Sequence, residues 1–483
     1  MTAGKTVSGS QQARRRAIGQ GLAAVGLFSS AMALAASQPQ NILPTPQASA
    51  SPTAAPGATP NAMPNAAPSA APSAAPSAAP TTAPKIVAQM PLDEPVVSWS
   101  VGDAGALLGV IEGIDADGLI PADYQPVKLR SAIAAGDAAA LNAQASRAFA
   151  WLAEDMRDGR TRFDARLQWF VVDTDIDTQP TSALMARALQ AHDVAGVISG
   201  LQPTVPDYGE LKGLLAVTPA RDKAKRSLIR INMDRWRWLP RELGKYYLLT
   251  NVPEFQLRLT VDNSIIRSYR TIVGKVGKTA TPQLAAVVQG VVFNPTWTVP
   301  QSIVKGEGLG AKLIGDPAAA LRQGYKVSRA KDGTITVVQQ PGPGNSLGMI
   351  KLDMTNEHAI FIHETPSRGL FAQPYRALSH GCVRTERAAE LGITMAILGA
   401  GMTSSDAVDI VNSGKYTRVP MTKTFPVYIM YFTMASDITG KMGTFPDLYS
   451  RDGAVLAAFA APRAPWTGQR QSTEKVIKLD NPL

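Results

Sequence analysis

The chain has 483 residues, a net charge of +10 at pH 7 and a single cysteine. This length allows two or three domains, and one cysteine excludes an internal disulfide framework. The positive charge would suit an anionic surface or polymer. However, the sequence has no basic helix with base-reading side chains, no zinc-ligand spacing and no aromatic platform among the Lys and Arg residues, so nucleic acid is not an expected partner.

Residues 1–36 have the pattern of an export signal. Arg14–Arg16 precede the apolar stretch "AIGQGLAAVGLFSSAMALAA", and Ala33 and Ala35 suit the positions before a signal-peptidase cleavage site. We expect cleavage after Ala35 and a periplasmic location, with membrane attachment only if the signal stays uncleaved. The paired arginines also resemble a twin-arginine signal, so the export route stays open.

Two contrasting segments follow the signal. Residues 37–95 are rich in Ala and Pro ("NAAPSAAPSAAPSAAPTTAP"), a composition that cannot build a core and predicts an extended linker. Residues 96–226 carry apolar side chains at spacings of three and four ("DAGALLGVIEGI", "AALNAQASRAFAWLAEDMRDGR", "SALMARALQAHDVAGVISGL"), which predicts a helical domain. Gly118, Gly159 and Gly200 stand where its helices would end.

The hydrophobic period changes near residue 228. We interpret "LIRINMDRWRWLP" as the opening of a strand-rich region, with strands at "KYYLLTNV", "FQLRLTVD", "SIIRSYRTIVG", "TITVVQQ", "AIFIHET" and, further on, "FPVYIMYFTMASD". The segments "FNPTWTVPQSIVKGEGLG" and "QQPGPGNSLG" have the Pro, Gly and Asn content of long loops. Loops of this kind commonly line a functional site.

The lone cysteine, Cys382, is the candidate nucleophile. A thiol attacks carbonyl groups as its thiolate, so a catalytic cysteine needs a nearby histidine, a helix N-terminus or both. We expect a helix at "TERAAELGITMAILGAG", starting near Thr385, whose N-terminus would favour the thiolate. The N–H groups of Gly381 and Cys382 are the expected oxyanion donors, and Gly381 would let a substrate approach the backbone closely.

Three histidines lie shortly before this cysteine. His363 ends an expected strand and can approach the thiol across a sheet, whereas His380 is too close in sequence to align well with the sulfur. His363 is therefore the favoured general base. His358 lies in the polar segment "TNEHA" and is interpreted as structural. Without a second thiol or an HExxH spacing, no metal or other cofactor is expected.

Arginines lie on both sides of the nucleophile. The Arg384 guanidinium is placed to bind a substrate carboxylate, and the alternative is a local ion pair with Glu364 or Glu386. For Arg376 the local, structural role is preferred.

These residues resemble the signature of the L,D-transpeptidase catalytic domain: His363, fifteen intervening residues, and then Ser379-His380-Gly381-Cys382-Val383-Arg384. The blocks "IVGKVGKTATP", "FNPTWTVPQSI", "PGPGNSLGMIKLDM" and "IFIHETPSRGLF" are similar to those of the large periplasmic subgroup, and the resemblance spans residues 96–460. It implies an α+β chain with a helical scaffold domain and then a β-rich catalytic domain at 227–400. That domain would be a mixed β-sandwich with a helix behind the nucleophile, followed by a C-terminal extension at 401–483.

The resemblance also implies a reaction. The enzyme would attack the L,D-centred peptide bond of a peptidoglycan tetrapeptide stem, release D-Ala and form a 3-3 cross-link to a second stem through an acyl-enzyme. The resemblance implies peptide stems as both donor and acceptor and wall-synthesis proteins as further partners. It also implies inhibition by carbapenem-type β-lactams. By this resemblance Cys382 is the nucleophile, His363 the base and Gly381 an oxyanion donor. Arg384, His380 and Ser379 would bind the substrate or support the site. Trp297 would begin a capping loop at 297–345, or serve instead as a core anchor.

Alternatives to transpeptidation remain open. Water could take the acceptor role, which would make the chain an L,D-carboxypeptidase or a hydrolase that releases wall-linked protein. An inactive fold could serve as a non-catalytic wall-binding protein, although the complete signature argues against this. The subgroup's small peptidoglycan-binding module has no counterpart between "LQPTVPDYGELKGLLAV" and "LIRINMDRW". Glycan affinity would then come from the catalytic face, the basic charge or a partner.

Overall fold

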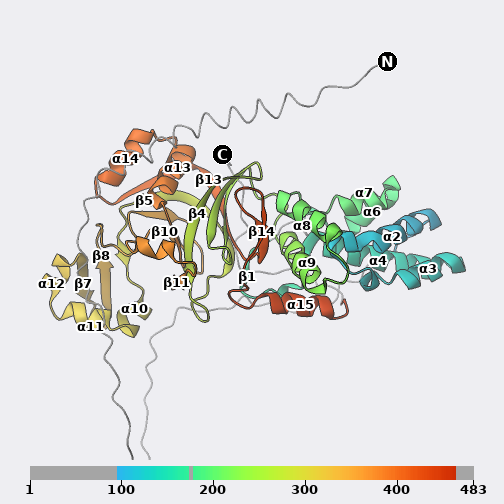
Figure 1. Ribbon diagram of the computed structural model, residues 1–483, viewed down its shortest axis with the longest axis horizontal. Coiled ribbons are helices and arrows are strands. Elements are labelled where there is room, and N and C mark those ends of the chain that lie inside the picture. The colour runs from blue at the N-terminus through green and yellow to red at the C-terminus, as the bar shows by residue number, and fades with distance from the viewer. Residues whose placement is uncertain (1–94, 173–177, 464–483) are drawn as a thin grey trace, which may run out of the picture. The chain divides into compact units, whose positions relative to one another are not determined.

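The computed structural model of the chain describes residues 95–172 and 178–463. The expected export signal, nearly all of the expected linker and residues 464–483 lie outside these ranges. In the described residues a group of helices is followed by a β-rich region (Figure 1), which confirms the expected α+β class. None of the described helices combines the length and apolar character needed to cross a membrane.

The N-terminal helical region has a hydrophobic core of its own. Its α-helices are α2 (Val101–Gly113), α3 (Pro126–Ala135), α4 (Ala138–Asp158), α6 (Thr181–Ala191), α7 (Val194–Ser199) and α8 (Pro206–Val217), with short 3-10 helices η3 (Ile114–Asp117), η4 (Pro121–Tyr124) and η5 (Phe163–Ala165) between them. At the start of α4 the Asp137 side chain accepts hydrogen bonds from the Ala139 and Ala140 N–H groups. The expected helices are confirmed, as are helix ends at Gly118, Gly159 and Gly200.

Helix α9 (Lys223–Arg237) occupies the stretch that was expected to open the strands, and that expectation is wrong. The Asp222 side chain starts the helix by accepting a hydrogen bond from the Lys225 N–H. Polar side chains such as Asn232 and Asp234 are as fully buried as their apolar neighbours, and a pattern of apolar residues alone does not reveal such burial. The helix also runs through the boundary expected at residue 227.

The β-rich region is built around one sheet that closes on itself. In pairing order its strands are β1 (Trp169–Phe170), β5 (Gln283–Phe293), β13 (Thr417–Met430), β2 (Tyr246–Asn251), β3 (Gln256–Val261), β4 (Ser264–Gly274), β12 (Val383–Thr385), β10 (Ile362–His363) and β9 (Ile350–Asp353), with β11 (Ala377–Ser379) beside β4. Strand β9 also pairs with β5, which closes the ring. Parallel and antiparallel pairs are mixed, and the enclosed core includes Leu257, Val291 and Val427. Strand β5 is the long strand that the sequence pattern did not identify.

Residues beyond 400 belong to the same sheet. Strand β13 lies between β5 and β2, although the catalytic domain was expected to end at residue 400. Helix α13 (Ala388–Ala400) packs on β13 and β5, and α14 (Ser404–Asn412) packs on α13. Strands β14 (Met434–Ser436) and β15 (Met442–Thr444) form a small hairpin, and α15 (Asp452–Ala460) contacts α9.

Residues 297–339 form a small unit with its own core, drawn in yellow at the left of Figure 1. It contains β6 (Trp297–Thr298), α10 (Gln301–Gly306), α11 (Leu309–Ile314), α12 (Pro317–Arg322), β7 (Tyr325–Arg329) and β8 (Ile335–Gln339). The three strands form a separate sheet in the order β6-β8-β7. A segment expected as a loop therefore contains short helices, and we call residues 297–339 the cap.

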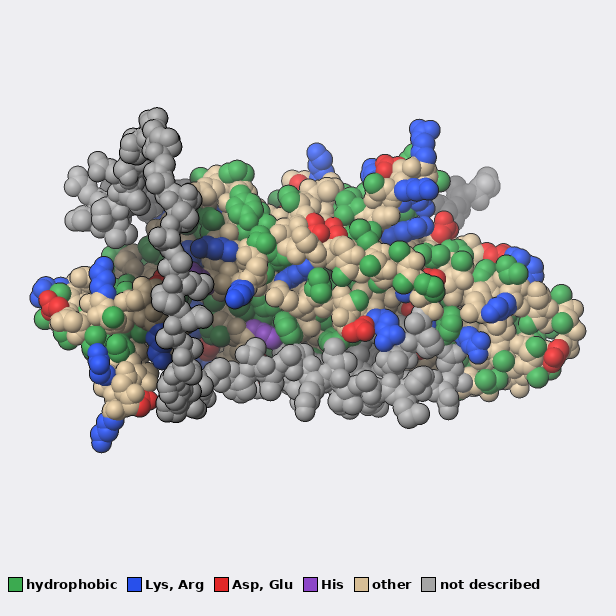
Figure 2. Space-filling view, turned by 90° about the horizontal axis from the view of Figure 1, so that it is seen from below, with side chains coloured by type: hydrophobic (Ala, Val, Ile, Leu, Met, Phe, Trp, Pro, Cys, Tyr) green, Lys and Arg blue, Asp and Glu red, His purple; other side chains and the backbone are tan. Residues whose placement is uncertain are grey.

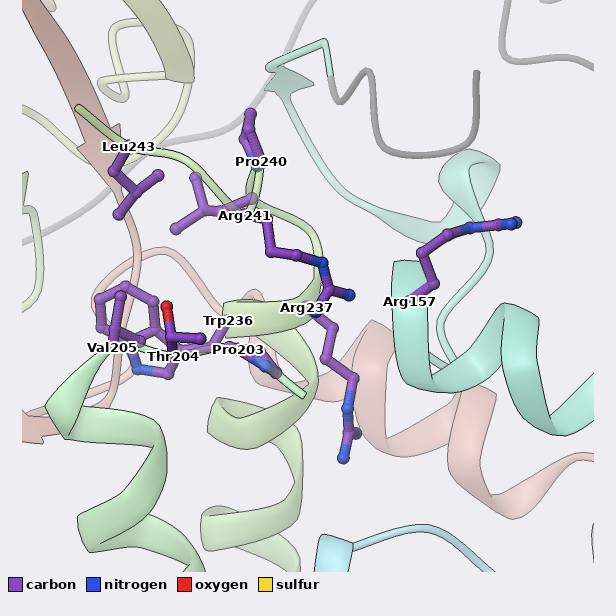
Figure 3. A pocket seen from close by; sticks show the side chains of 10 residues that line it. Arg157, Pro203, Thr204, Val205, Trp236, Arg237, Pro240, Arg241 and Leu243 are labelled. Atoms are coloured by element: carbon purple, nitrogen blue, oxygen red, sulfur yellow. The ribbon is translucent and has the colours of Figure 1, made fainter. Parts of the chain in front are cut away.

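Helix α9 joins the helical region to the sheet region. The buried Asn232 side chain accepts a 2.9 Å hydrogen bond from the Thr433 N–H and donates a 3.0 Å bond to the Thr433 hydroxyl. At the C-terminal end of α9, Trp236, Arg237 and Arg241 line a small hollow (Figure 3). Neither the cysteine nor any histidine lines it, so the expected chemistry lies elsewhere.

Candidate active site

The nucleophile lies in a tight turn between β11 and β12. Cys382 is free and partly buried, and its Sγ lies 3.7 Å from the Ala359 carbonyl oxygen, to which the thiol donates. Gly381 has a φ of +117°, a conformation that favours glycine, and a Cβ at this position would come within 3.2 Å of the Ile360 side chain. The sequence therefore needs glycine immediately before the cysteine.

Ser379 holds this turn in shape. Its hydroxyl donates a 2.6 Å hydrogen bond to the Cys382 carbonyl and accepts a 3.1 Å bond from the Gly381 N–H. The Gly381 N–H, an expected oxyanion donor, is therefore engaged with Ser379 in this conformation. Among the hydrogen bonds of the described residues, none uses the Cys382 N–H, so this group remains available.

The expected helix behind the nucleophile begins later than predicted. Residues after Cys382 continue as strand β12, and α13 begins only at Ala388, after Arg387 with a φ of +51°. A helix dipole acts within its first turn, so α13 does not supply the stabilisation of the thiolate that a start near Thr385 would have given. Stabilisation of the thiolate comes instead from a backbone hydrogen bond of Phe361 and from the charges of Lys351 and Arg384.

Three ionisable residues form a row on the outer face of the sheet. His363 in β10 is in register with Arg384 in the parallel strand β12 and with Lys351 in the antiparallel strand β9. Their neighbours Ile350, Ile362 and Val383 point into the core, as the alternation of side chains in a strand requires. Directly opposed side chains have Cβ atoms about 5 Å apart. Lys351, His363 and Arg384 therefore flank one another beside Cys382.

His363 is a buried, neutral base. Its Nδ1 is hydrogen-bonded to the Glu364 carbonyl, which can only accept, so Nδ1 carries the proton and Nε2 keeps its lone pair. Burial, followed by the positive charge of Arg384, lowers the pKa of His363 to about 4. The imidazole is therefore uncharged at neutral pH and able to take a proton.

Cys382 is subject to opposing influences. Burial raises the pKa of its thiol above the ordinary value, whereas a backbone hydrogen bond from Phe361 and the charges of Lys351 and Arg384 lower it. The thiol is thus protonated at neutral pH in the resting site, and attack requires a base. The thiol donates to the Ala359 carbonyl rather than to His363, so this hydrogen bond must be exchanged before proton transfer.

The other predicted residues have distinct surroundings. The exposed His380 Nε2 lies 3.5 Å from a carboxylate oxygen of Glu307 in the cap. Trp297 packs, partly buried, against the core of the cap, which is the anchoring role. The His358 ring contacts Phe170 at 4.0 Å between centroids, in keeping with a structural role. Arg376 donates to three backbone carbonyls, which also agrees with the structural interpretation.

Arg384 does not make either of the ion pairs considered for it. Glu364 pairs with Arg368, and Glu386 accepts two hydrogen bonds from Arg270. In the described residues Arg384 has no carboxylate partner, and its buried Nε has no hydrogen-bond acceptor. The guanidinium therefore remains available to a ligand.

Sequence reasoning missed three residues of the site. In "IKLD" Lys351 lies between two core residues, so the sequence alone could have placed it on the outer face of the sheet. Its pairing with His363 on another strand could not be predicted, because the two residues are not close in sequence. Ala359 accepts from the thiol while holding a φ of +51°, which nothing in the sequence indicates for an alanine. Thr281 donates a hydrogen bond to the Gly381 carbonyl from 100 residues away.

A thiol beside a neutral histidine has the chemistry of a cysteine nucleophile and its general base, which acyl transfer and hydrolysis both use. Comparison with known families then narrows the choice. Residues 245–395 match the model of the L,D-transpeptidase catalytic domain, and residues 98–215 match that of a scaffold domain. Residues 245–395 of the chain are therefore an L,D-transpeptidase catalytic domain, as the signature indicates.

Individual relatives are distant. A Haemophilus influenzae protein named "Putative L,D-transpeptidase" is 29% identical over 226 residues, which are 44% of this chain and 45% of that protein. The chain thus spans less than half the length of this curated relative. An L,D-transpeptidase structure from Mycobacterium smegmatis is 14% identical, covers 39% of this chain and 59% of its own, and has a TM-score of 0.20. The ertapenem-acylated L,D-transpeptidase catalytic domain from E. faecium is 16% identical and also has a TM-score of 0.20. That match covers 39% of this chain and 99% of the E. faecium domain. Likeness at this level carries no argument about function.

Proposed function

We propose that this chain is an exported transpeptidase that forms 3-3 cross-links between peptidoglycan peptide stems. The observation that carries the proposal is the placement of Cys382 beside neutral His363 on the outer face of an L,D-transpeptidase sheet. The export pattern of residues 1–36 supports a site of action in the periplasm.

In the first half of the reaction His363 Nε2 takes the thiol proton as Cys382 Sγ attacks the carbonyl carbon of the L,D-centred bond. The Cys382 N–H, which none of the described hydrogen bonds uses, is the backbone donor for the developing oxyanion. Collapse of the tetrahedral intermediate breaks the C–N bond, and His363 returns the proton to the nitrogen of the departing D-Ala. A thioester to the shortened stem remains on Cys382.

In the second half the side-chain amine of another stem attacks the thioester. His363 accepts a proton from that amine, the C–S bond breaks, and the thiol is regenerated by the same proton. Two tetrapeptide stems thus give one cross-linked product and one D-Ala. If water attacks instead, the products are a tripeptide stem and D-Ala.

Binding of the wall polymer would depend on positive charge that is spread over the surface of the protein. Figure 2 shows Lys and Arg side chains spread along the face of the molecule rather than gathered in one patch. With the net charge of +10, this distribution suits weak, salt-sensitive attraction to an anionic wall polymer.

The test is product analysis with purified chain and a disaccharide-tetrapeptide, followed by liquid chromatography and mass spectrometry. A dimer lacking one D-Ala, absent with Cys382→Ala, is the expected result. Tripeptide monomer as the sole product would replace the proposal with the hydrolase alternative. Products that persist in the Cys382→Ala variant would contradict both.

A further inference from the structure

Lys351 is a half-buried cation that the reaction steps above do not use. In the described residues its ammonium forms no ion pair within contact distance, although the charge of Asp353 raises its pKa. The carboxylate two residues away, Asp353, is held by Arg418 at 2.7 Å. A partly buried cation without a counter-ion is costly unless a ligand supplies the anion.

The position of the Lys351 ammonium is fixed by an aromatic ring. Its Nζ lies 3.7 Å from the centroid of Phe361, a cation–π contact. Phe361 precedes Ile362, which is in register with Val383, and the Phe361 carbonyl accepts a 2.9 Å hydrogen bond from the Val383 N–H. The Phe361 backbone therefore lies opposite Cys382, and the charge of the Lys351 ammonium acts on the thiol, whose pKa it lowers.

Arg384 approaches the same point from the opposite side of His363. It follows Cys382 by two residues, so the two side chains share a face of the strand. The electrostatics agree with this geometry. Burial lowers the pKa of both cations, and negative charge raises it, from Asp353 and then Cys382 for Lys351 and from Cys382 for Arg384. Two cations that lack carboxylate partners thus converge beside one sulfur.

The donor stem offers a matching anion. The D-Ala that leaves a tetrapeptide carries the terminal carboxylate, and covalent geometry keeps that carboxylate within about 5 Å of the carbonyl carbon that the thiol attacks. A cation that binds it must therefore lie next to the nucleophile. Ionised partners also give the stronger hydrogen bonds, and Arg can bind a carboxylate in bidentate fashion.

We propose that Lys351 and Arg384 form a two-cation site that binds the terminal carboxylate of the acyl-donor stem beside Cys382. The identity of that carboxylate rests on the proposed function, whereas the anion site itself does not. Lys351 supplies the half of the site on β9, and Arg384 the half on β12.

The first test compares two small alkylating reagents, anionic iodoacetate and neutral iodoacetamide, reacting with Cys382 at one pH and low salt. An anion site raises the iodoacetate-to-iodoacetamide rate ratio above that of a free thiol, and salt lowers it. We expect Lys351→Met to reduce the ratio about fivefold or more and Lys351→Arg to keep it, in line with typical charge-pair energies. Lys423→Met, on an exposed part of β13, is the matched control.

An unchanged ratio in Lys351→Met, with the fold confirmed by circular dichroism, overturns the anion site. Because neither reagent is a wall fragment, this result does not depend on transpeptidation. A reduced ratio without turnover of disaccharide-tetrapeptide would support the anion site while the proposed function fails.

The second test compares a tetrapeptide donor with the same peptide carrying a C-terminal amide. Wild-type enzyme should prefer the carboxylate form in kcat/KM, and Lys351→Met should lose most of that preference. Equal discrimination by Lys351→Met and wild type would overturn the assignment of the terminal carboxylate to this site.

Discussion

The Thr281 hydroxyl donates a 2.8 Å hydrogen bond to the Gly381 carbonyl across 100 residues of sequence. The same oxygen accepts a 2.8 Å bond from the Gly274 N–H at the end of β4. Tyr449 extends the connection, because its hydroxyl accepts from the Thr281 N–H and donates to the Gly274 carbonyl. The nucleophile turn is thus positioned by residues from three distant parts of the chain.

Replacing Thr281 with valine should therefore affect both stability and catalysis. The change keeps the shape of the side chain but leaves a buried carbonyl and a buried N–H unpaired, at a cost of about 1–3 kcal/mol in the free energy of unfolding. We expect kcat to fall because the turn at Cys382 is no longer held. Thr281→Ser keeps the hydroxyl and should restore most of both quantities in urea unfolding and turnover assays. If valine and serine variants behave alike, the hydrogen bonds do not position the turn.

The pKa of His363 predicts a specific loss of stability in acid. Its ordinary value is 6.5, and the fold lowers it to about 4. Between these values the unfolded chain binds a proton that the folded chain excludes, so stability is complete above pH 6.5 and is lost as the pH falls toward 4. This single group accounts for about 3 kcal/mol. Urea unfolding across this pH range should show the loss in wild type and a shallower dependence in His363→Gln; identical slopes would show that other groups are responsible.

The proposed function also predicts acylation by carbapenems. The strained lactam carbonyl should be attacked by Cys382, and opening of the ring keeps the whole inhibitor attached. Intact-protein mass spectrometry should show a gain of one inhibitor mass, absent in Cys382→Ala. His363→Gln should slow the reaction about a hundredfold or more, because general-base assistance is lost. An unchanged wild-type mass after prolonged incubation would count against the nucleophile assigned here.

Asn232 should be important for stability rather than for chemistry. Its side chain makes two buried hydrogen bonds to Thr433, 201 residues away. Asn232→Ala leaves the Thr433 N–H unpaired inside the protein, and we expect a loss of about 2–4 kcal/mol when this penalty and the lost packing are combined. Asn263→Ala removes the same amide group at a less buried position, a turn residue with positive φ, and serves as the comparison. Equal urea midpoints for wild type and Asn232→Ala would show that α9 does not depend on this contact.

The helices of the N-terminal region were predictable because each has a distinct local pattern. In α4, apolar residues repeat at helical spacing, Asp137 provides the N-cap and Gly159 follows the last turn. Helix α9 was not predictable in this way. Its charged residues Arg235 and Arg237 are buried by contacts with distant segments, and those contacts cannot be inferred from the local sequence.

Some residues of the site could be predicted from a local sequence pattern, and others could not. His363, Ser379 and Cys382 stand in a short segment whose order and spacing reveal their chemistry. Lys351 contributes through strand pairing, and register between strands distant in sequence is not encoded in any local pattern. The hydrogen bond from the Gly381 N–H to Ser379 could not be predicted for a similar reason, since it forms only in the folded turn.

The most direct test of the account is detection of the acyl-enzyme. The purified chain is mixed with disaccharide-tetrapeptide, quenched in acid at short times and analysed by intact mass and peptide mapping. The account predicts an adduct equal to the donor minus D-Ala on the peptide that contains Cys382, together with free D-Ala. Release of D-Ala without such an adduct, or its release by Cys382→Ala, would contradict the account.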